Sequence, residues 1–371
     1  MEDITQLRQN FPVTRNKIYL NHAAHSPLPK PVRDAMWKHI EEFSEYGDTK
    51  DLDDGKSSFA SLINAAKDEV ALVENTSMGL NIIANMLNYP PGSNIVTTDL
   101  EYPTVVYPWM KRKLGVTVRY VNNYAGKILL EDLEKAMDNK TVAVAISHVE
   151  YMNGFRFDLK ALSEITHKHG AYLIIDAIQS LGVLLVDVKR DDVDFITAGC
   201  YKWMLGPLGV GYLYVRGDLI EKFEPSFIGW ASVKPEVFKT IDMWEIHRLN
   251  LSETASRFEV GTPSRVSLCG AVAALKLLLN TGIDNIEKRV LKLTDHLIDK
   301  LSEKGLKFQT PLEPECRSGI VNFLIDNAQE RTSKLAEKGI VVSARSHGIR
   351  VSPHFYNTEE EIDKLVEETT K

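Results

Sequence analysis

Short runs of apolar residues, each bounded by polar residues or glycine, recur through the first two thirds of this 371-residue chain. They lie at Asn94–Thr98, Val116–Val121, Val142–Ser147, Tyr172–Asp176, Phe195–Ala198 and Gly211–Val215. Such runs are typical of short strands buried inside a protein. Segments with helical apolar spacing separate them, such as Leu159–His169, after which Gly170 marks a helix end. The alternation predicts an α/β fold with a mostly parallel sheet.

The last third of the chain has a different pattern. It consists of a helical stretch at Leu268–Leu306, strand-like runs at Gly319–Ile325 and Ile340–Ala344, and a final helix at Thr358–Glu368 with a threonine N-cap. A chain of this length exceeds the ~250 to 300 residues at which one hydrophobic core usually stops growing. We therefore predict a large domain over residues 16–262 and a smaller α+β domain over 263–371, which the N-terminal segment 1–15 joins.

Composition and charge exclude several classes of partner. Hydrophobic residues make up 44% of the chain and charged residues 26%, the balance of an ordinary globular protein. The net charge is -7 and no basic block interleaves with aromatic residues, so we expect no nucleic-acid partner. No run approaches the ~18 apolar residues of a membrane span, and the start MEDITQLRQNF is unlike a signal peptide. We expect a cytoplasmic protein without a membrane partner.

Several familiar motifs are missing from the sequence. It has neither a GxxxxGK[ST] phosphate loop nor an HExxH zinc motif. The glycine cluster Gly206–Gly211 leads into a predicted strand, whereas a dinucleotide fingerprint needs a helix at that point. The pairs His22/His25 and His167/His169 lack a nearby third ligand, so we expect no metal site.

Two residues in the segment 171–211 follow the ends of predicted strands. Asp176 ends one strand, and Lys202 follows the next. Ligands of open α/β sheets bind at the carboxyl ends of the strands. One interpretation is an ion pair that joins the two strand ends. The other is a pyridoxal phosphate site, in which a lysine amine forms a Schiff base with the cofactor and a carboxylate keeps its pyridine nitrogen protonated.

At this point the sequence resembles the class V aminotransferases, a family of fold-type I pyridoxal enzymes that includes cysteine desulfurases, kynureninase and isopenicillin N epimerase. The resemblance spans nearly the whole chain. The matching blocks are Tyr19–Ala24, Asn75–Asn81, Ser147–Val149 with Gly154, Asp176–Gln179, Tyr201-Lys202 with Gly206-Pro207, Arg257–Pro263, and Arg350 with Tyr356-Asn357. The resemblance implies a large domain with a mostly parallel seven-stranded sheet and a smaller α+β C-terminal domain.

The resemblance also implies which residues hold the cofactor. Lys202 matches the family's Schiff-base lysine, Asp176 the partner of the pyridine nitrogen, and Gln179 a hydrogen-bond donor to the ring oxygen. Tyr102 stands where desulfurases have a histidine that stacks on the ring, and a tyrosine can also stack there.

Another set of residues is expected around the cofactor phosphate. Thr76 and Ser77 stand at a predicted helix start, where a phosphate is naturally bound, and either can also be a plain N-cap. Tyr201 matches a phosphate-contacting position of the family. Thr262 matches a residue that reaches the phosphate held by the neighbouring subunit, which implies a homodimer with shared active sites.

On the substrate side, Arg350 matches the family's arginine for the substrate carboxylate, because a guanidinium forms two parallel hydrogen bonds to two oxygens. The alternative is a surface arginine. His25 and Tyr151 lie where relatives line the substrate pocket, as do Glu150 and Trp230, and an ordinary packing role is the alternative for each.

The reaction type follows from two departures from the desulfurases. Tyr102 replaces their histidine, and the segment Ala344–Ile349 lacks the cysteine that receives sulfur as a persulfide, while Cys269 and Cys316 do not align with it. The family acts through an external aldimine and a quinonoid, and we expect an aminotransferase for a small amino acid. A carbon-sulfur lyase without the persulfide cysteine, or an epimerase of the isopenicillin N type, is the alternative. A non-catalytic binding protein is a remote one.

Overall fold

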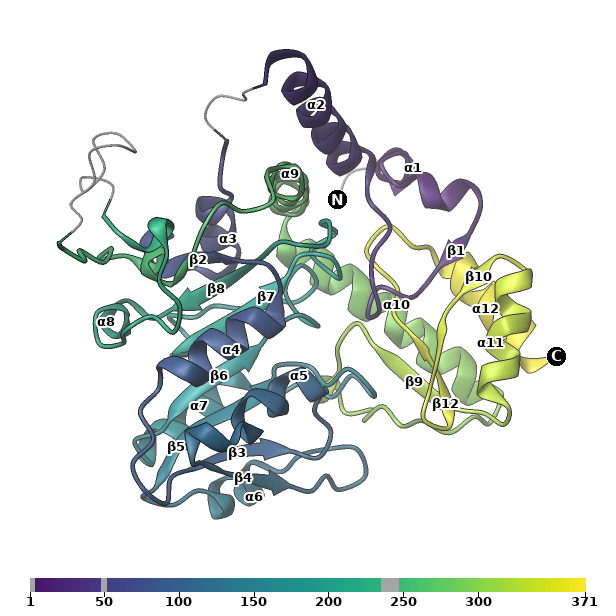
Figure 1. Cartoon of the computed structure of the whole chain (residues 1–371). Coiled ribbons are helices and arrows are strands. Elements are labelled where there is room, and N and C mark those ends of the chain that lie inside the picture. The colour runs from purple at the N-terminus through teal and green to yellow at the C-terminus, as the bar shows by residue number, and fades with distance from the viewer. Residues whose placement is uncertain (1–3, 48–51, 235–246) are drawn as a thin grey trace.

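The computed structural model describes residues 4–47, 52–234 and 247–371, and a seven-stranded sheet lies at its centre (Figure 1). The strands, in their order across the sheet, are β2 (Val70–Val73), β8 (Gly211–Val215), β7 (Phe195–Gly199), β6 (Tyr172–Asp176), β5 (Thr141–Ser147), β3 (Asn94–Thr98) and β4 (Thr117–Val121). Strands β7, β6, β5, β3 and β4 are parallel, and β8 is antiparallel to both its neighbours. The predicted mostly parallel α/β sheet is confirmed. Each of the six strands predicted in the first two thirds of the chain agrees with an observed one to within one residue at either end, and β2 was not predicted.

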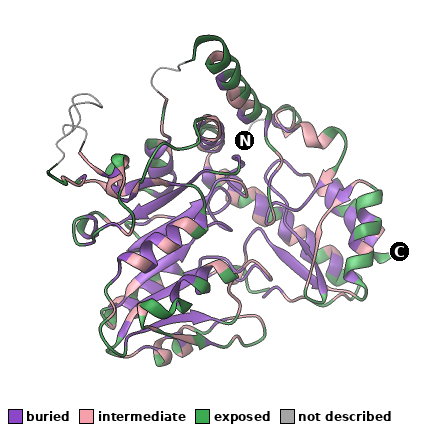
Figure 2. Cartoon of the chain, in the orientation of Figure 1, coloured by how far each residue is buried: buried purple, intermediate pink, exposed green. Residues whose placement is uncertain are grey.

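Helices cover both faces of this sheet. The longer ones are α2 (Lys30–Tyr46), α3 (Lys56–Ile63), α4 (Thr76–Met86), α6 (Leu130–Ala136), α7 (Leu159–Lys168), α9 (Arg265–Thr281), α10 (Ile283–Glu303), α11 (Ala328–Glu337) and α12 (Glu359–Thr370), and the shorter ones are α1 (Ile4–Arg8), α5 (Pro103–Val106) and α8 (Gly217–Ile220). Leu173 and Ile175 of β6 pack in a core with α3, α7 and α9, whereas Ile174 packs in a core with α4 and α5. Side chains alternate across a strand, so every second residue reaches the other layer. Figure 2 shows the inner strands as buried.

The C-terminal part builds a separate three-stranded antiparallel sheet in the order β11 (Ser343–Arg345), β12 (Gly348–Val351) and β9 (Val321–Leu324). Its apolar face packs against α10 and α12 in a core of its own. Strand β1 (Ile18–Tyr19) pairs in parallel with β10 (Ile340–Val341), so the N-terminal segment lies against the C-terminal part. The boundaries 16–262 and 263–371 stay predictions.

The stretch predicted as helical at Leu268–Leu306 is helical and consists of two helices, whose separation was not predicted. Gly282, with φ of 82°, separates α9 from α10, and the two axes are bent by 80°. The bend lets α9 pack along α2 while α10 packs against α12. A glycine tolerates this positive φ at low cost, which is why the chain turns there. The final helix does begin after Thr358, whose hydroxyl accepts a hydrogen bond from Glu361 N.

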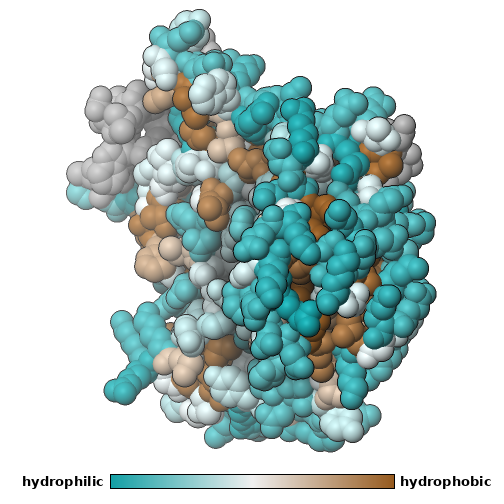
Figure 3. Space-filling model, turned by 90° about the vertical axis from the view of Figure 1, so that its right-hand side faces the viewer, coloured by the Kyte–Doolittle hydropathy of each residue, from teal (hydrophilic) through white to brown (hydrophobic). Residues whose placement is uncertain are grey.

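The surface on the side of the C-terminal elements is mainly hydrophilic, with smaller hydrophobic patches between the polar side chains (Figure 3). None of the described helices is by itself long and apolar enough to cross a membrane. Helices α9 and α10 reach that length and composition together, across their 80° bend.

Helix α4 lies unusually close to β7 because Gly79 has no side chain. A Cβ at this position would lie 2.1 Å from Oγ1 and 2.8 Å from Cβ of Thr197. Thr197 belongs to a buried central strand, so neither partner has room to move. The close approach fixes the N-terminal end of α4 at the edge of the sheet.

We predict that Gly79→Ala lowers the free energy of unfolding by about 1 to 3 kcal/mol, because the added methyl overpacks this contact. Alanine is the better helix former by roughly 1 kcal/mol, so a loss identifies packing as the cause. The matched control is Gly270→Ala in α9, where the nearest atoms belong to the flexible side chain of Met36. Urea denaturation measures both variants, and an unchanged or raised stability of Gly79→Ala would contradict the packing argument.

Candidate functional site

A pocket lies at the carboxyl ends of β5, β6 and β7, beside the N-terminal end of α4. Eight of the residues predicted to hold a cofactor or substrate line it: Thr76, Ser77, Tyr102, Tyr151, Asp176, Gln179, Tyr201 and Lys202. Asn75, Thr104, Ser147 and Ile178 complete the wall. The parallel strands end together at this edge, and so they bring side chains from distant parts of the sequence to one place.

The N-terminal end of α4 forms one side of this pocket. Its N-cap is Asn75, whose side chain accepts a hydrogen bond of 2.9 Å from Met78 N, so neither Thr76 nor Ser77 is the cap. Thr76 Oγ1 instead accepts a 2.9 Å hydrogen bond from Gly199 N at the end of β7. Ser77 Oγ hydrogen-bonds the hydroxyl of Thr104. The positive end of the helix dipole therefore lies beside hydroxyl groups in the pocket wall, an arrangement that suits an anion such as phosphate.

Asp176 and Lys202 both line this pocket. Asp176 is 2% exposed, and its Oδ1 accepts a hydrogen bond of 2.9 Å from Ile178 N. Both residues belong to the described chain, and no ion pair within 4.0 Å joins them. Lys202 Nζ lies 5.8 Å from the ring centres of both Tyr102 and Tyr201. A direct ion pair across the strand ends, the first interpretation from the sequence, is therefore absent between these two side chains.

Burial changes the charge of both groups. Loss of water raises the pKa of Asp176 to about 6, although the Ile178 amide and the charge of Lys202 oppose the change. Desolvation lowers the pKa of Lys202 to about 8, although Asp176 opposes it, and Arg350 and Arg345 add to the lowering. Near neutral pH, Asp176 is thus mostly ionised and a fraction of Lys202 is a neutral amine that can act as a nucleophile or base.

Gln179 is held by two hydrogen bonds. Its Oε1 accepts from the Trp203 indole at 2.9 Å, and its Nε2 donates to the carbonyl of Ala23 at 3.0 Å. One N–H of the amide is left for the pocket, because an amide nitrogen carries two. Trp203 is itself supported by His354, whose Nε2 lies 3.0 Å from the Trp203 carbonyl. The C-terminal part of the chain thus orients a side chain of the pocket.

Arg350 extends from the three-stranded sheet to the backbone of Tyr151, a residue of the pocket wall. It is 1% exposed, and its Nη1 donates a 2.6 Å hydrogen bond to the carbonyl of Tyr151. Its Nε and Nη2 are buried and have no hydrogen-bond partner among the described residues. Tyr151 in turn packs edge-on against Tyr102, with ring centres 5.1 Å apart. Arg350 is thus a buried cation next to the pocket wall, which contradicts the alternative of a surface arginine.

Three further residues predicted at the site lie outside the pocket wall. His25 is exposed, although the next residue, Ser26, donates hydrogen bonds to the carbonyls of Tyr201 and Lys202 at 2.8 and 2.6 Å. Thr262 is exposed on the stretch that precedes α9. Trp230 is 60% exposed and is also absent from the wall. Their roles stay predictions.

The carboxyl groups of Glu101 and Glu150 are buried behind the pocket wall. The sequence did not indicate this burial. Glu101 accepts hydrogen bonds from Ser147 N at 2.6 Å and Ser147 Oγ at 2.7 Å. Glu150, expected in the pocket, is fully buried and accepts from Thr98 Oγ1 at 3.1 Å. Burial raises the pKa of Glu101 to about 8 and that of Glu150 well above its ordinary range. The pair therefore retains protons at neutral pH and adds little negative charge near Asp176.

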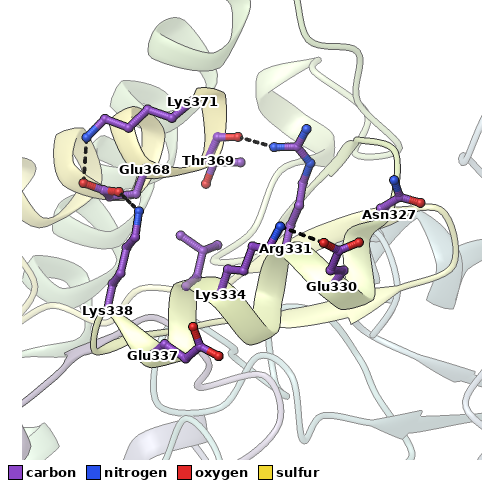
Figure 4. Close-up of a pocket in the computed structure, with 10 residues that line it drawn as sticks. Asn327, Glu330, Arg331, Lys334, Glu337, Lys338, Glu368, Thr369 and Lys371 are labelled. Carbon is purple, nitrogen blue, oxygen red and sulfur yellow. Dashed lines mark hydrogen bonds and ion pairs between the residues drawn. The ribbon is translucent and has the colours of Figure 1, made fainter.

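A second, larger cavity of about 530 Å³ lies between α11 and α12 (Figure 4). Its basic side chains already have partners: Lys338 and Lys371 pair with Glu368, and Lys334 pairs with Glu330. Arg331 donates to the carbonyl of Thr369 at 2.9 Å. Because these charges are satisfied, the smaller pocket at the strand ends is the better candidate for chemistry.

Comparison with known proteins relates nearly the whole chain to one family. A sequence model described as Aminotransferase class-V matches residues 18–365. An uncharacterized aminotransferase of Bacillus subtilis, YcbU, is 31% identical, with 98% of this chain and 96% of that protein covered. A probable cysteine desulfurase of Pyrococcus abyssi is 30% identical over 97% of this chain and 95% of its own. A solved structure of a C-DES mutant, with glycine covalently linked to its PLP cofactor, shares the fold with a TM-score of 0.89 and 23% identity, over 98% of this chain and 99% of its own.

We predict that Lys202 in the cofactor-free protein titrates near pH 8, because desolvation disfavours its charged form. At pH 7 its neutral fraction should exceed that of a lysine with a pKa of 10.5 about 300-fold. Competitive labelling with acetic anhydride across pH 6 to 11, followed by peptide mass spectrometry, measures this titration.

The Asp176→Asn variant should move that titration to lower pH, because the carboxylate favours the charged amine. Asp187→Asn is the matched control, since Asp187 binds Asn64 away from the pocket. Half-maximal labelling of Lys202 near pH 10.5, or no shift in Asp176→Asn, would contradict the assigned electrostatics.

Proposed function

The chain belongs to the aminotransferase class-V family, and on that premise we propose that it transfers the amino group of a small amino acid to a keto acid. It is an enzyme that depends on pyridoxal phosphate and acts on an amino acid. The observation that supports the finer proposal best is the gap between the Lys202 amine and the Asp176 carboxylate, together with the lack of a cysteine near Arg350.

The pocket residues fit this cofactor. A phosphate suits the N-terminal end of α4 with Thr76 and Ser77, and Tyr201 adds a hydroxyl on the same wall. An aromatic ring suits the gap between Lys202 and Asp176, which no direct ion pair closes. The remaining N–H of Gln179 suits the ring oxygen, and Tyr102 suits stacking against the ring. Every one of these fits uses a side chain whose hydrogen-bonding or stacking capacity is available.

When bound, the cofactor supplies an aldehyde that condenses with amines and a ring that accepts the electrons of the broken Cα–H bond. Asp176 would hold a proton on the pyridine nitrogen. A pKa near 6 keeps its carboxylate ionised at neutral pH, as that task requires. Lys202 Nζ would take the proton from the substrate's Cα, and a pKa near 8 lets the neutral amine do so. Arg350 would bind the α-carboxylate through its two unpartnered N–H groups.

The C-terminal sheet favours transamination over sulfur transfer. Strands β11 and β12 are joined by the two-residue turn Ser346-His347, so no loop with a cysteine precedes Arg350. Cys200 is buried, and burial raises the pKa of its thiol. Cys269 lies in α9. Cys316 lies in a short 3-10 helix, and its carbonyl accepts a hydrogen bond from Arg156 N. None of the three thiols lines the pocket, so no thiol stands where a persulfide would have to form.

Carbon-sulfur lysis is the second candidate. Its support is the 30% identity to a protein named a probable cysteine desulfurase. Elimination needs the same α-proton removal by Lys202 but no protein thiol, and so the pocket described above could also serve it. An epimerase has no comparable support.

A homodimer with shared active sites and a cytoplasmic location belong to the same proposal. Thr262 is exposed in the single chain, where a second copy could meet it, and the resemblance assigns it to the neighbour's phosphate. His25 beside the Lys202 loop and Tyr151 in the pocket wall would contact the substrate.

We predict that the protein loaded with pyridoxal phosphate converts an amino acid and a keto acid into the corresponding keto acid and new amino acid in equal amounts. Screening the common amino acids with pyruvate and 2-oxoglutarate, with amino acid analysis of products, measures this. Sulfide and racemised substrate are assayed in the same reactions. The variant Lys202→Ala should lose at least about 10³-fold in kcat because it lacks the base, and the surface variant Lys189→Ala should not change it.

Release of sulfide without a new amino acid would replace the proposal with carbon-sulfur lysis. Formation of the mirror-image amino acid would replace it with epimerisation. An enzyme that binds the cofactor but converts none of the amino acids would contradict all three reactions.

A further inference from the structure

Two arginines project from the same face of the β11–β12 hairpin. Ser343 of β11 is paired directly with Arg350 of β12, and Arg345 is paired with Gly348. Directly paired residues share a face of the sheet, and so do residues two apart along a strand. Arg345 and Arg350 are therefore diagonal neighbours. The opposite face carries Ile349, whose side chain is part of the C-terminal core.

The arginine face is turned toward the pocket. Arg350 donates to the carbonyl of Tyr151, and the side chain of Tyr151 lines the pocket wall. Arg345 is close enough to influence the pKa of Tyr151, Lys202 and Arg350, and its positive charge lowers all three. The hairpin thus carries two arginines on the face from which Arg350 contacts Tyr151 of the pocket wall.

Neither guanidinium has an acidic partner in the described chain. Arg345 Nη1 donates to the carbonyl of the preceding residue, Ala344, at 2.7 Å, and no carboxylate lies within 4.0 Å of it. Other partly buried arginines do face a carboxylate, such as Arg156 with Glu287 at 3.0 Å and Arg317 with Asp295 at 2.7 Å. Arg350 is buried and Arg345 is half-buried, and two like charges partly removed from water without a counterion are unfavourable, so this pair suits an anionic ligand.

The charge of the pair exceeds what one carboxylate neutralises. Burial lowers the pKa of Arg350 to about 9, and Arg345 is the largest charged contributor to that change. The α-carboxylate of an amino acid supplies a single negative charge, which Arg350 would bind. Asp176 is committed to the ring nitrogen in the proposed function, and the buried Glu101 and Glu150 retain protons. A second anionic group on the substrate would supply the negative charge that these protein groups do not.

We propose that the substrate is an amino acid with an acidic side chain, a carboxylate or a sulfinate, and that Arg345 binds this second anionic group while Arg350 binds the α-carboxylate. The inference rests on the proposed function, because it names the substrate class of the same site. It adds Arg345, which the resemblance to the family did not single out. A planar guanidinium suits either anion, since both offer two oxygens for parallel hydrogen bonds.

Kinetics with matched substrates test the assignment. The loaded enzyme should show a kcat/KM at least about 10-fold higher for L-aspartate, L-glutamate or L-cysteine sulfinate than for L-asparagine, L-glutamine or L-alanine. Arg345→Gln should lower kcat/KM for its best acidic substrate about 10- to 100-fold and change that for the neutral ones less than about 3-fold. Arg345→Lys keeps the positive charge but lacks the planar guanidinium. Its kcat/KM for the acidic substrate should therefore lie between those of the wild type and Arg345→Gln. Arg119→Gln on the edge strand β4 is the control, because Arg119 pairs with Asp138 there.

A binding measurement separates this inference from the proposed function. Isothermal titration calorimetry compares glutarate with butyrate on the wild-type holoenzyme and on Arg345→Gln. Glutarate should bind at least about 10-fold more tightly than butyrate to the wild type, and the variant should lose that difference. Equal binding of the two acids, equal loss for acidic and neutral substrates, or a preference for neutral amino acids would each overturn the assignment. If no amino acid reacts, the proposed function fails, and the calorimetric comparison still decides the role of Arg345.

Discussion

The separation of one buried carboxylate from one desolvated amine is the constraint on which the rest of the site depends. Asp176 and Lys202 have opposite charges and share a pocket, yet no ion pair within 4.0 Å joins them. An unopposed pair would collapse together in a low-dielectric interior. Rigid elements hold them apart instead: Asp176 ends a central strand, and the carbonyl of Lys202 accepts hydrogen bonds from Ser26 and Leu205. These contacts fix the backbone from which each side chain enters the pocket.

Contacts from several parts of the structure position the residues of this pocket. The Gly79 contact fixes the N-terminal end of α4 beside the pocket, and the Thr76 hydroxyl ties it to the end of β7. From the C-terminal part, His354 supports Trp203, and Trp203 orients Gln179. Arg350 is placed by the three-stranded sheet, whose other face is anchored in its own core. Residues more than two hundred positions apart in the sequence therefore act on one small space.

The sequence predicted what local pattern determines. The strands β3, β6 and β8 were predicted to the residue, because each is a short apolar run with clear boundaries. Asp176 and Lys202 could be placed at one edge because strand ends coincide in a parallel sheet. The break at Gly282 was missed, since leucine spacing continues through it and the bend depends on what α9 and α10 pack against. The position of Arg345 beside Arg350 was not predicted. It depends on which residues pair across the hairpin, and sequence spacing alone does not reveal that register.

The mechanism requires that Lys202 and Asp176 bind the two ends of a single cofactor. Borohydride reduction of the protein loaded with pyridoxal phosphate fixes the cofactor to the lysine that holds it, and peptide mass spectrometry then identifies that lysine. The account predicts the pyridoxyl group on the peptide that contains Lys202, and a weaker affinity for the cofactor in Asp176→Ala. A pyridoxyl group on any other lysine, or cofactor affinity unchanged by the loss of Asp176, would contradict it.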